Sequence, residues 1–206
     1  RGPDDEGVWV DAAAGVALGH RRLAIVDLSP AGHQPMVSAD GRFALTYNGE
    51  IFNAAELRAE LAASGRSFRG HSDTEVLVEG CAAWGVLACV QRLIGMFAFA
   101  LWDRKARALT LARDRLGIKP LYWTPAGGRL YFGSELKSVL LGPEVRRDLD
   151  VDGLDHYLSF LYTPPDGSIF TGIRKLPPGH LLHWHDGHCR VTPYWQVPRG
   201  ETFSGS

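Results

Sequence analysis

The 206-residue chain has few cysteines, and nothing suggests that they pair. Its three cysteines, Cys81, Cys89 and Cys189, are odd in number and form no CxxC motif. Cys81 and Cys89 lie in an apolar stretch with helical character, where a free cysteine behaves as a small hydrophobic residue. This usage indicates a reducing compartment rather than a disulfide framework, and we therefore expect a cytoplasmic protein.

Long apolar runs and excess charge are also lacking. The longest apolar run, Leu93–Trp102, falls short of the roughly 20 residues that a membrane helix needs. The formal net charge is −1, which gives no electrostatic argument for nucleic acid or an anionic membrane as partner. No signal peptide is visible and the chain does not begin with methionine, so we expect a fragment whose N-terminus lies upstream.

The composition is that of a folded domain, with 45% hydrophobic and 22% charged residues. Short apolar runs between turn residues predict strands, then two or three helices, then strands again, which indicates a layered α+β domain. The expected strands are 8–10, 16–18, 23–27, 43–47, 96–102, 108–112, 121–123, 130–132, 181–184 and 188–191. The expected helices are 54–63 with Asn53 as cap, 72–84 ending at Gly85, 86–93, 134–141 with Ser134 as cap, and 154–160.

Three polar clusters are candidates for chemistry. Arg21 and Arg22 precede an apolar run, and an arginine fork suits a carboxylate, although most surface arginines bind nothing specific. Asn48 and Gly49 supply an amide and a backbone N–H that could stabilise an oxyanion, although Asn-Gly most often makes a hairpin turn. The segment His71–Glu75 has a structural explanation, a capping box at a helix start. Its functional explanation is that Asp73 faces a ligand amine.

The eight histidines predict no metal site. His180, His183, His185 and His188 cluster, but they straddle an expected hairpin turn without an acidic or cysteine set beside them. We therefore expect no metal ligands.

Taken together, the motifs resemble one family. In order, the chain shows Arg-Gly-Pro-Asp, His-x-Arg-Leu-x-Ile-Val-Asp, Asn-Gly-Glu-Ile-Phe-Asn and Ser-Asp-x-Glu, a series similar to the class II glutamine amidotransferase domain. These motifs occupy residues 1–4, 20–27, 48–53 and 72–75, and the stretches 95–103, 113–122 and 132–137 resemble the asparagine synthetase branch. The resemblance runs from residue 1 to about residue 195.

The resemblance implies a fold and a reaction. The family fold is the N-terminal nucleophile hydrolase sandwich, a four-layer αββα arrangement with two antiparallel sheets. The family reaction hydrolyses glutamine to glutamate and ammonia, and a second domain uses ATP and Mg to amidate aspartate. The expected organisation is an amidotransferase domain over 1–195, with about 143–195 as its C-terminal extension, followed by a linker over 196–206.

Roles follow for individual residues. By resemblance, Arg22 pairs with the glutamine α-carboxylate, and Glu50 and Asp73 hold the α-amino group. Asn48 and the Gly49 N–H form the oxyanion hole. The backbone of the segment after Arg22 lines the pocket, which adds Leu23, Ile25 and Val26 to the expected binding residues.

Several expected parts are missing from the sequence. The family nucleophile is an N-terminal cysteine, and none of the three cysteines is N-terminal, so this chain alone is expected to be inactive. The ATP-pyrophosphatase motif Ser-Gly-Gly-x-Asp-Ser is also absent, so a synthetase domain is expected elsewhere in the polypeptide. No cofactor is expected in this domain, and a homodimer is a possible assembly.

Two alternatives stay open. The domain could be a degenerate relative that binds an amino acid or a partner without catalysis. It could also serve an enzyme that amidates another carboxylate, in secondary-metabolite or polysaccharide synthesis.

Overall fold

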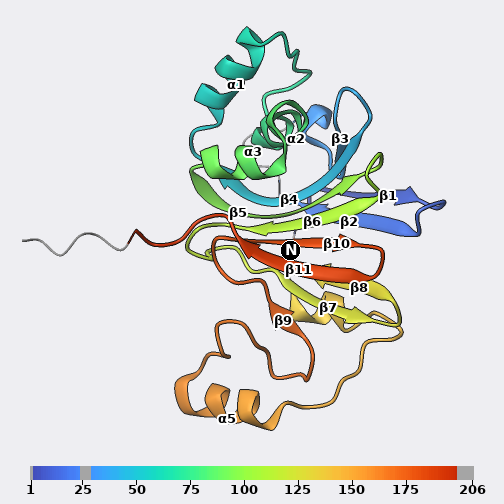
Figure 1. The fold of residues 1–206 in the computed structure, drawn as a ribbon, viewed down its shortest axis with the longest axis vertical. Coiled ribbons are helices and arrows are strands. Elements are labelled where there is room, and N and C mark those ends of the chain that lie inside the picture. Colours follow the sequence, from blue (N-terminus) through green and yellow to red (C-terminus); the bar gives the residue numbers. More distant parts are fainter. Residues whose placement is uncertain (1, 24–28, 199–206) are drawn as a thin grey trace, which may run out of the picture.

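A large antiparallel sheet forms the centre of the molecule (Figure 1). The computed structural model describes residues 2–23 and 29–198, and the structural statements below concern these ranges. No helix in these ranges is long and apolar enough to cross a membrane. The sheet has the order β11-β10-β6-β5-β4-β3. Its strands are β3 (Met36–Val37), β4 (Phe43–Ile51), β5 (Gly95–Asp103), β6 (Ala108–Arg113), β10 (His180–His185) and β11 (His188–Pro193).

Three helices cover one face of this sheet (Figure 1). They are α1 (Ala54–Ala63), α2 (Asp73–Trp84) and α3 (Val86–Arg92). Leu57 and Leu61 of α1 are buried at i,i+4 spacing, as the sequence predicts for one helix face. They join Val76 and Val90 from the other two helices in a core against the alternate residues of β4 and β5.

Smaller sheets cover the other face. One is the ribbon of β1 (Asp5–Asp11) and β2 (Val16–Arg22), and the other joins β7 (Tyr122–Ala126), β8 (Arg129–Gly133) and β9 (Arg174–Lys175) in the order β8-β7-β9. Leu18 of β2 and Trp123 of β7 pack with Ala44, Ala100 and Leu111 of the large sheet in a second core. The two cores lie on opposite faces of the large sheet.

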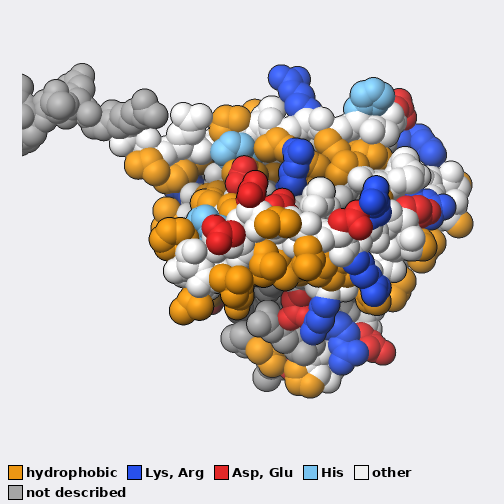
Figure 2. All heavy atoms as spheres, turned by 90° about the horizontal axis from the view of Figure 1, so that it is seen from below, with side chains coloured by type: hydrophobic (Ala, Val, Ile, Leu, Met, Phe, Trp, Pro, Cys, Tyr) orange, Lys and Arg blue, Asp and Glu red, His pale blue; other side chains and the backbone are white. Residues whose placement is uncertain are grey.

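The last layer is thin. The short helix α4 (Leu136–Val139) packs Val139 with Ile173 and Tyr131 against the outer side of β7 and β8. Helix α5 (Val151–Phe160) lies at the far end of the molecule (Figure 1), and Gly153 is its only buried residue. Figure 2, seen from the α5 end, shows hydrophobic side chains gathered on this face. The order helices, sheet, sheets, helices is the αββα arrangement expected from the sequence.

Most of the expected elements are confirmed, and one prediction from residue type is wrong. Asn48-Gly49 does not form a turn, because β4 continues to Ile51 and pairs with β5 residue by residue as far as Gly95. The expected strand 23–27 is not found at Leu23, which follows β2, and its remaining residues lie outside the described ranges. The sequence did not predict the short strands β3 and β9, or the 3-10 turn Pro30–Gly32.

Of the three expected helix caps, those at Asn53 and Ser134 are wrong, and the capping box at Ser72 is only partly formed. The Asn53 side chain does not cap α1; it accepts from the Ile94 N–H at 2.9 Å and donates to the Arg92 carbonyl at 3.0 Å. Helix α4 begins at Leu136, so Ser134 is not its cap. Ser72 does cap α2 by accepting from the Glu75 N–H, but the Glu75 carboxylate accepts from Arg69 and Gly70 instead of completing a capping box.

Candidate active site

The candidate site lies at the end of β4, where the strand passes the end of β3. Alternate residues of β4 face opposite sides of the sheet. Leu45, Tyr47 and Ile51 belong to the core under the helices, whereas Ala44 belongs to the core between the sheets. By this alternation Asn48 and Glu50 point to the same side as Ala44, towards the β1–β2 ribbon.

The backbone N–H groups of alternate β4 residues point out of the open edge of the strand. The Phe43 N–H donates to Ser38 Oγ at 3.0 Å, the Tyr47 N–H to Gln34 Oε1 at 2.7 Å and the Ile51 N–H to Asp73 Oδ2 at 3.0 Å. Each of these acceptors is a side chain outside β4. On both sides of β3, side chains therefore take the place of a neighbouring strand along this edge.

The Gly49 N–H shares this edge but has no acceptor among the described residues. Gly49 lies opposite Phe97 of β5, and the Phe97 backbone is bonded on its far side to Asp114. Gly49 and Phe97 are thus a non-hydrogen-bonded pair, so the Gly49 N–H points away from β5. It lies between two occupied donors, those of Tyr47 and Ile51, and is available to an anionic oxygen.

Only glycine fits at position 49. A Cβ there would clash with the Met96 carbonyl oxygen and lie 2.7 Å from Phe97 Cα, both backbone atoms of β5. A side chain would push the strands apart at the residue whose N–H faces the edge. Close strand approach, rather than a turn, is the physical reason for the glycine.

Asp73 reaches the same edge from the first residue of α2. It is 7% exposed, and its Oδ2 accepts from the Tyr47 hydroxyl at 2.7 Å and from the Ile51 N–H. Burial, with the Asp73 charge and hydrogen bond added to it, raises the pKa of Tyr47 far above its usual range, so Tyr47 remains a donor. No hydrogen bond to Oδ1 occurs among the described residues, which leaves that oxygen to meet an ammonium group.

Arg22 ends the ribbon strand β2. Its Nη1 donates to the Ser29 carbonyl at 3.2 Å, and a Cβ on Gly32 would clash with the guanidinium and lie 2.7 Å from Cζ. Arg22 therefore rests against the 3-10 turn Pro30–Gly32, and glycine at position 32 makes room for it. The sequence identified Arg22 but not Gly32.

Gln34 links the Arg22 side of the site to the Asp73 side, and sequence reasoning missed it. It is 6% exposed and lies two residues after Gly32. Its side chain accepts from the Tyr47 N–H and donates to Thr74 Oγ1 at 3.3 Å, next to Asp73. Nothing in the local sequence signals this role, because both partners lie far along the chain.

Of the remaining expected binding residues, two are exposed in the structure and two lie outside the described ranges. Glu50 is exposed at the end of β4, next to Gly49, and Leu23 is exposed directly after Arg22. Ile25 and Val26 lie outside the described ranges. The described candidates thus fall into two groups: Asn48, Gly49, Glu50 and Asp73 around the end of β4, and Arg22 with Leu23 at the end of β2.

His20 connects these two strands. Its Nδ1 lies 3.4 Å from Thr46 Oγ1, which itself donates to the Gly19 carbonyl at 3.2 Å. Burial, assisted by the nearby Arg22 charge, lowers the pKa of His20 to about 4, so the ring is neutral at pH 7. An open cavity of about 510 Å³ borders His20, Gly19 and Arg21 on the ribbon.

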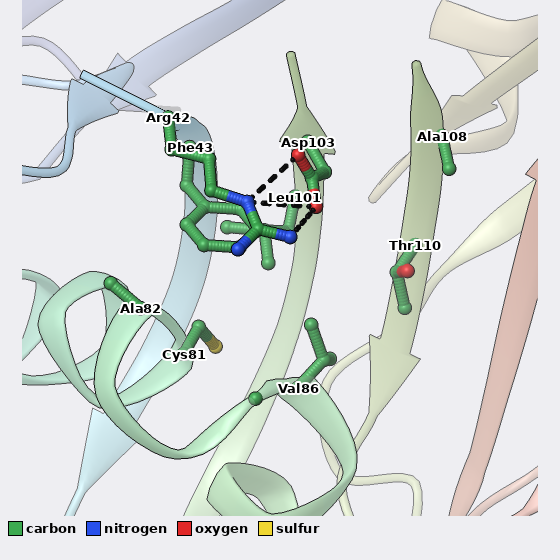
Figure 3. Close-up of a pocket in the computed structure, with 10 residues that line it drawn as sticks. Arg42, Phe43, Cys81, Ala82, Val86, Leu101, Asp103, Ala108 and Thr110 are labelled. Atoms are coloured by element: carbon green, nitrogen blue, oxygen red, sulfur yellow. Dashed lines mark hydrogen bonds and ion pairs between the residues drawn. The ribbon is translucent and has the colours of Figure 1, made fainter. Parts of the chain in front are cut away.

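A second pocket, of about 200 Å³, lies at the opposite end of β4 (Figure 3). It is lined by Phe43, Cys81 and Thr110, and Arg42 donates to Asp103 beside it. A hydrogen bond with Cys89 and burial raise the pKa of Cys81 well above its usual value. A thiol of this kind is a poor nucleophile, and the pocket is not near Gly49.

Metal ligands are not assembled in the described residues, which contain no group of three or more His, Cys, Asp or Glu suited to an ion. Of the four clustered histidines, His183 bonds Thr110, while His180 and His188 bond nearby carbonyl oxygens.

Comparison with known proteins identifies the family. A family model described as "Glutamine amidotransferase domain" matches residues 1–195. The chain belongs to this family. Within the family, it is 41% identical over 201 residues to asparagine synthetase [glutamine-hydrolyzing] 3 of Bacillus subtilis, a match that covers 96% of this domain and 32% of the relative. It is 42% identical over 190 residues to a putative asparagine synthetase [glutamine-hydrolyzing] of Mycobacterium tuberculosis, covering 87% and 29%.

Other relatives carry different names or share only the fold. Amidase chry2 of Gibberella zeae is 36% identical over 210 residues, covering 99% of the amidotransferase domain and 30% of that protein. Glutamine phosphoribosylpyrophosphate amidotransferase from B. subtilis superposes with a TM-score of 0.62 at 23% identity, covering 88% of this domain and 35% of that chain. The domain therefore spans about a third of the length of each of these proteins. The fold expected from the sequence, an N-terminal nucleophile hydrolase sandwich, is confirmed.

Proposed function

We propose that the end of β4 is the site where this domain binds L-glutamine and supports its hydrolysis to glutamate and ammonia. The observation that carries the assignment is the Gly49 N–H, which points out of the strand edge between two occupied donors. In hydrolysis of an amide, negative charge develops on the carbonyl oxygen, and a fixed N–H donor stabilises it. Asn48, the preceding residue, supplies the second donor.

Charge fixes the orientation of the amino acid in this proposal. Arg22 takes the α-carboxylate, because its fork can donate two parallel hydrogen bonds. Asp73 Oδ1 and Glu50 take the α-ammonium. Leu23 lines the pocket on the Arg22 side, and Ile25 and Val26, which lie outside the described ranges, stay expected binding residues.

The nucleophile lies outside this assignment. The family resemblance implies an N-terminal cysteine, whose sulfur would attack the amide carbon. The carbon–nitrogen bond would then break, with the thiol proton passing to the leaving nitrogen to give ammonia and a thioester. Water would then hydrolyse the thioester to glutamate. Cys81 and Cys89 are buried and Cys189 has a pKa raised by burial, so none of them suits this step. The residues of this chain supply recognition and oxyanion support.

We further propose that the ammonia serves an ATP- and Mg-dependent ligase in the same polypeptide, which amidates aspartate in amino-acid biosynthesis. The names of the B. subtilis and M. tuberculosis relatives support this acceptor. The similarity to amidase chry2 supports the alternative that another compound is the substrate. The division into 1–195 and a linker 196–206, a homodimer and a cytoplasmic location stay predictions.

A binding experiment on the 206-residue chain tests the site. L-Glutamine titrated into the folded chain should shift the amide resonance of Gly49. Arg22→Ala should weaken binding about 10- to 100-fold, the loss expected for a charge-assisted hydrogen-bonded pair. Arg21→Ala is the matched control, since Arg21 pairs with Glu6 at the exposed surface and should bind like the wild type.

A second ligand tests whether Arg22 contacts the α-carboxylate. 4-Aminobutanamide lacks the α-carboxylate, so it should bind wild type and Arg22→Ala alike. A folded chain that shows no glutamine-dependent shift, or equal losses in Arg21→Ala and Arg22→Ala, would refute the assignment.

A further inference from the structure

Helix α5 exposes the face that its sequence would bury. Val151, Leu154, Leu158 and Leu161 recur at three- and four-residue spacing, the pattern of a helix that packs on a core. In the structure Val151 is 75%, Leu158 68% and Leu161 80% exposed. The helix instead rests on Gly153, where a Cβ would clash with the Ser168 carbonyl oxygen. Leu154 is partly buried, and none of the four residues belongs to a core cluster of the described residues.

Aromatic side chains extend the stripe and are already fixed in place. The His156 ring lies 4.8 Å from the Phe160 ring and 5.0 Å from the Tyr162 ring, and its Nδ1 lies 2.9 Å from the Tyr162 carbonyl oxygen. Phe160 and Tyr162 are both more than half exposed. A surface whose side chains are ordered before contact loses less conformational entropy on binding.

The backbone conformation of Leu161 is a second feature of this surface. It ends α5 in the left-handed conformation with φ 61°, a position where glycine is the usual residue and a bulky side chain is strained. An exposed leucine in this conformation destabilises the isolated domain without contributing to its core. A leucine at this position is explained if its side chain packs against a partner.

We propose that α5 together with Leu161 and Tyr162 is the surface on which the further part of the same polypeptide docks. The inference rests on the proposed function, in which this domain is joined to a ligase. Amidotransferase relatives extend well beyond the matched region, since the chain spans about 30% of their length and α5 lies inside the matched part. Asp152 and Asp155 border the stripe, so the facing surface should be an apolar groove with basic side chains at that border.

The covalent link within one polypeptide favours this occupant over a second copy of the chain. The exposed parts of Val151, Tyr157, Leu158, Phe160, Leu161 and Tyr162 amount to on the order of 700 Å². Stable complexes of separate chains bury roughly 600–1,000 Å² per partner, so the area by itself admits either occupant. Interfaces between domains of one polypeptide begin at about 600 Å², because the covalent link supplies an effective concentration in the millimolar range.

The decisive measurement is hydrogen–deuterium exchange of residues 151–162. It compares the 206-residue chain with the full polypeptide that the gene encodes. Exchange should be slower in the full polypeptide by about tenfold or more, because docking protects amides that open freely in the domain alone. Equal exchange in both proteins would overturn the proposal, as would a gene that encodes no further domain.

Substitutions then connect protection to the stripe. The double variant Leu158→Asp with Leu161→Asp should keep the melting temperature of the 206-residue chain but lose the extra protection in the full polypeptide. Leu141→Asp is the matched control, because Leu141 is 78% exposed but lies outside α5, and it should behave like the wild type in both measurements. Protection that survives the double variant contradicts the assignment.

Two further readouts separate the competing explanations. Leu161→Gly should raise the melting temperature of the 206-residue chain yet reduce protection in the full polypeptide, opposite signs that a purely structural role cannot give. Sedimentation of the 206-residue chain tests the second copy: a dimer that the double variant dissociates would overturn the proposed occupant. A full polypeptide that is protected at α5 but hydrolyses no glutamine would refute the proposed function alone.

Discussion

Buried polar side chains hold the edge of β4 in position. Gln34 accepts from the Tyr47 N–H and Asp73 accepts from the Ile51 N–H, one on each side of Gly49. Each replaces one bond that a neighbouring strand would have made. Because both acceptors are buried, their bonds are not in competition with water, and the position of the Gly49 N–H between them is well defined.

Replacing Gln34 should damage both stability and glutamine binding. Gln34→Met keeps the volume but leaves the Tyr47 N–H without an acceptor, which should lower the free energy of unfolding by about 1–3 kcal/mol. Urea denaturation measures this loss, and glutamine titration should show weaker binding. Gln91→Met, at an exposed position, should change stability by less than about 0.5 kcal/mol. Equal effects of the two substitutions would disprove the role of Gln34.

His20 should make the domain less stable as the pH falls below neutral. In the unfolded chain His20 binds a proton near pH 6.5, whereas in the fold its pKa is about 4, so acid favours the unfolded state between these values. The loss from pH 7 to pH 5 should be roughly 1–2 kcal/mol, reduced because the ring is partly exposed. Denaturation at several pH values measures it.

A matched pair isolates this effect. His20→Asn removes this contribution and should reduce the pH dependence, with a remainder from His183, whose pKa burial also lowers. His185→Asn, on the exposed β10–β11 hairpin, is the matched control. Asp5 and Asp40 have lowered pKa values and add their own loss only at more acidic pH, which is why the comparison stops at pH 5. A His20→Asn variant with the wild-type slope would contradict the assignment.

At the scale of elements, β4 joins the two halves of the site. Its backbone pairs with β5 along its whole length, its edge carries Gly49, and Thr46 contacts His20 of β2. The nine-residue strand therefore positions Asn48 and Gly49, the oxyanion donors that we propose, with respect to both Asp73 and Arg22. A shift of β4 against β5 should affect all of these contacts together.

Gly49→Ala should produce such a shift. The added methyl group meets backbone atoms of β5, which cannot rotate away as a side chain can, so the free energy of unfolding should fall by about 2–3 kcal/mol or more. Gly19→Ala is the control, since a Cβ at Gly19 meets nothing within 4 Å. It should alter stability by less than about 0.5 kcal/mol in thermal or urea unfolding. A Gly49→Ala variant as stable as Gly19→Ala would show that β4 and β5 are not in close contact.

At the scale of the whole molecule, two cores on opposite faces of the large sheet hold the layers together. Leu111 of β6 is fully buried in the core between the sheets. Leu158 of α5 belongs to neither core. The same substitution at these two positions therefore distinguishes residues that hold the domain together from those that we assign to docking.

Leu111→Ala should lower the free energy of unfolding of the 206-residue chain by about 2–5 kcal/mol, through lost burial and the cavity that remains. Leu158→Ala should change it by less than about 0.5 kcal/mol. Denaturant unfolding of both variants is the measurement. A large loss for Leu158→Ala would mean that α5 packs on the domain after all, which would also remove the basis of the docking proposal.

The sequence alone determined the features whose signals lie close together in the chain. The helix 54–63 matches α1, Gly85 ends α2, and hairpins join the expected strands 96–102 to 108–112 and 121–123 to 130–132. The order of short motifs also determined the family. These features depend on local periodicity and on turn geometry, and both are fixed by a few neighbouring residues.

Only the tertiary structure decided the features that depend on partners far along the chain. Asn48-Gly49 has the local pattern of a turn, yet β5, almost fifty residues later, makes it part of a strand. Gln34 and Asp73 meet at β4 because the fold brings three distant segments together. The stripe of α5 predicts burial, and the fold leaves it exposed. A pattern of residues specifies which face is apolar, but only the arrangement of the other elements determines what covers that face.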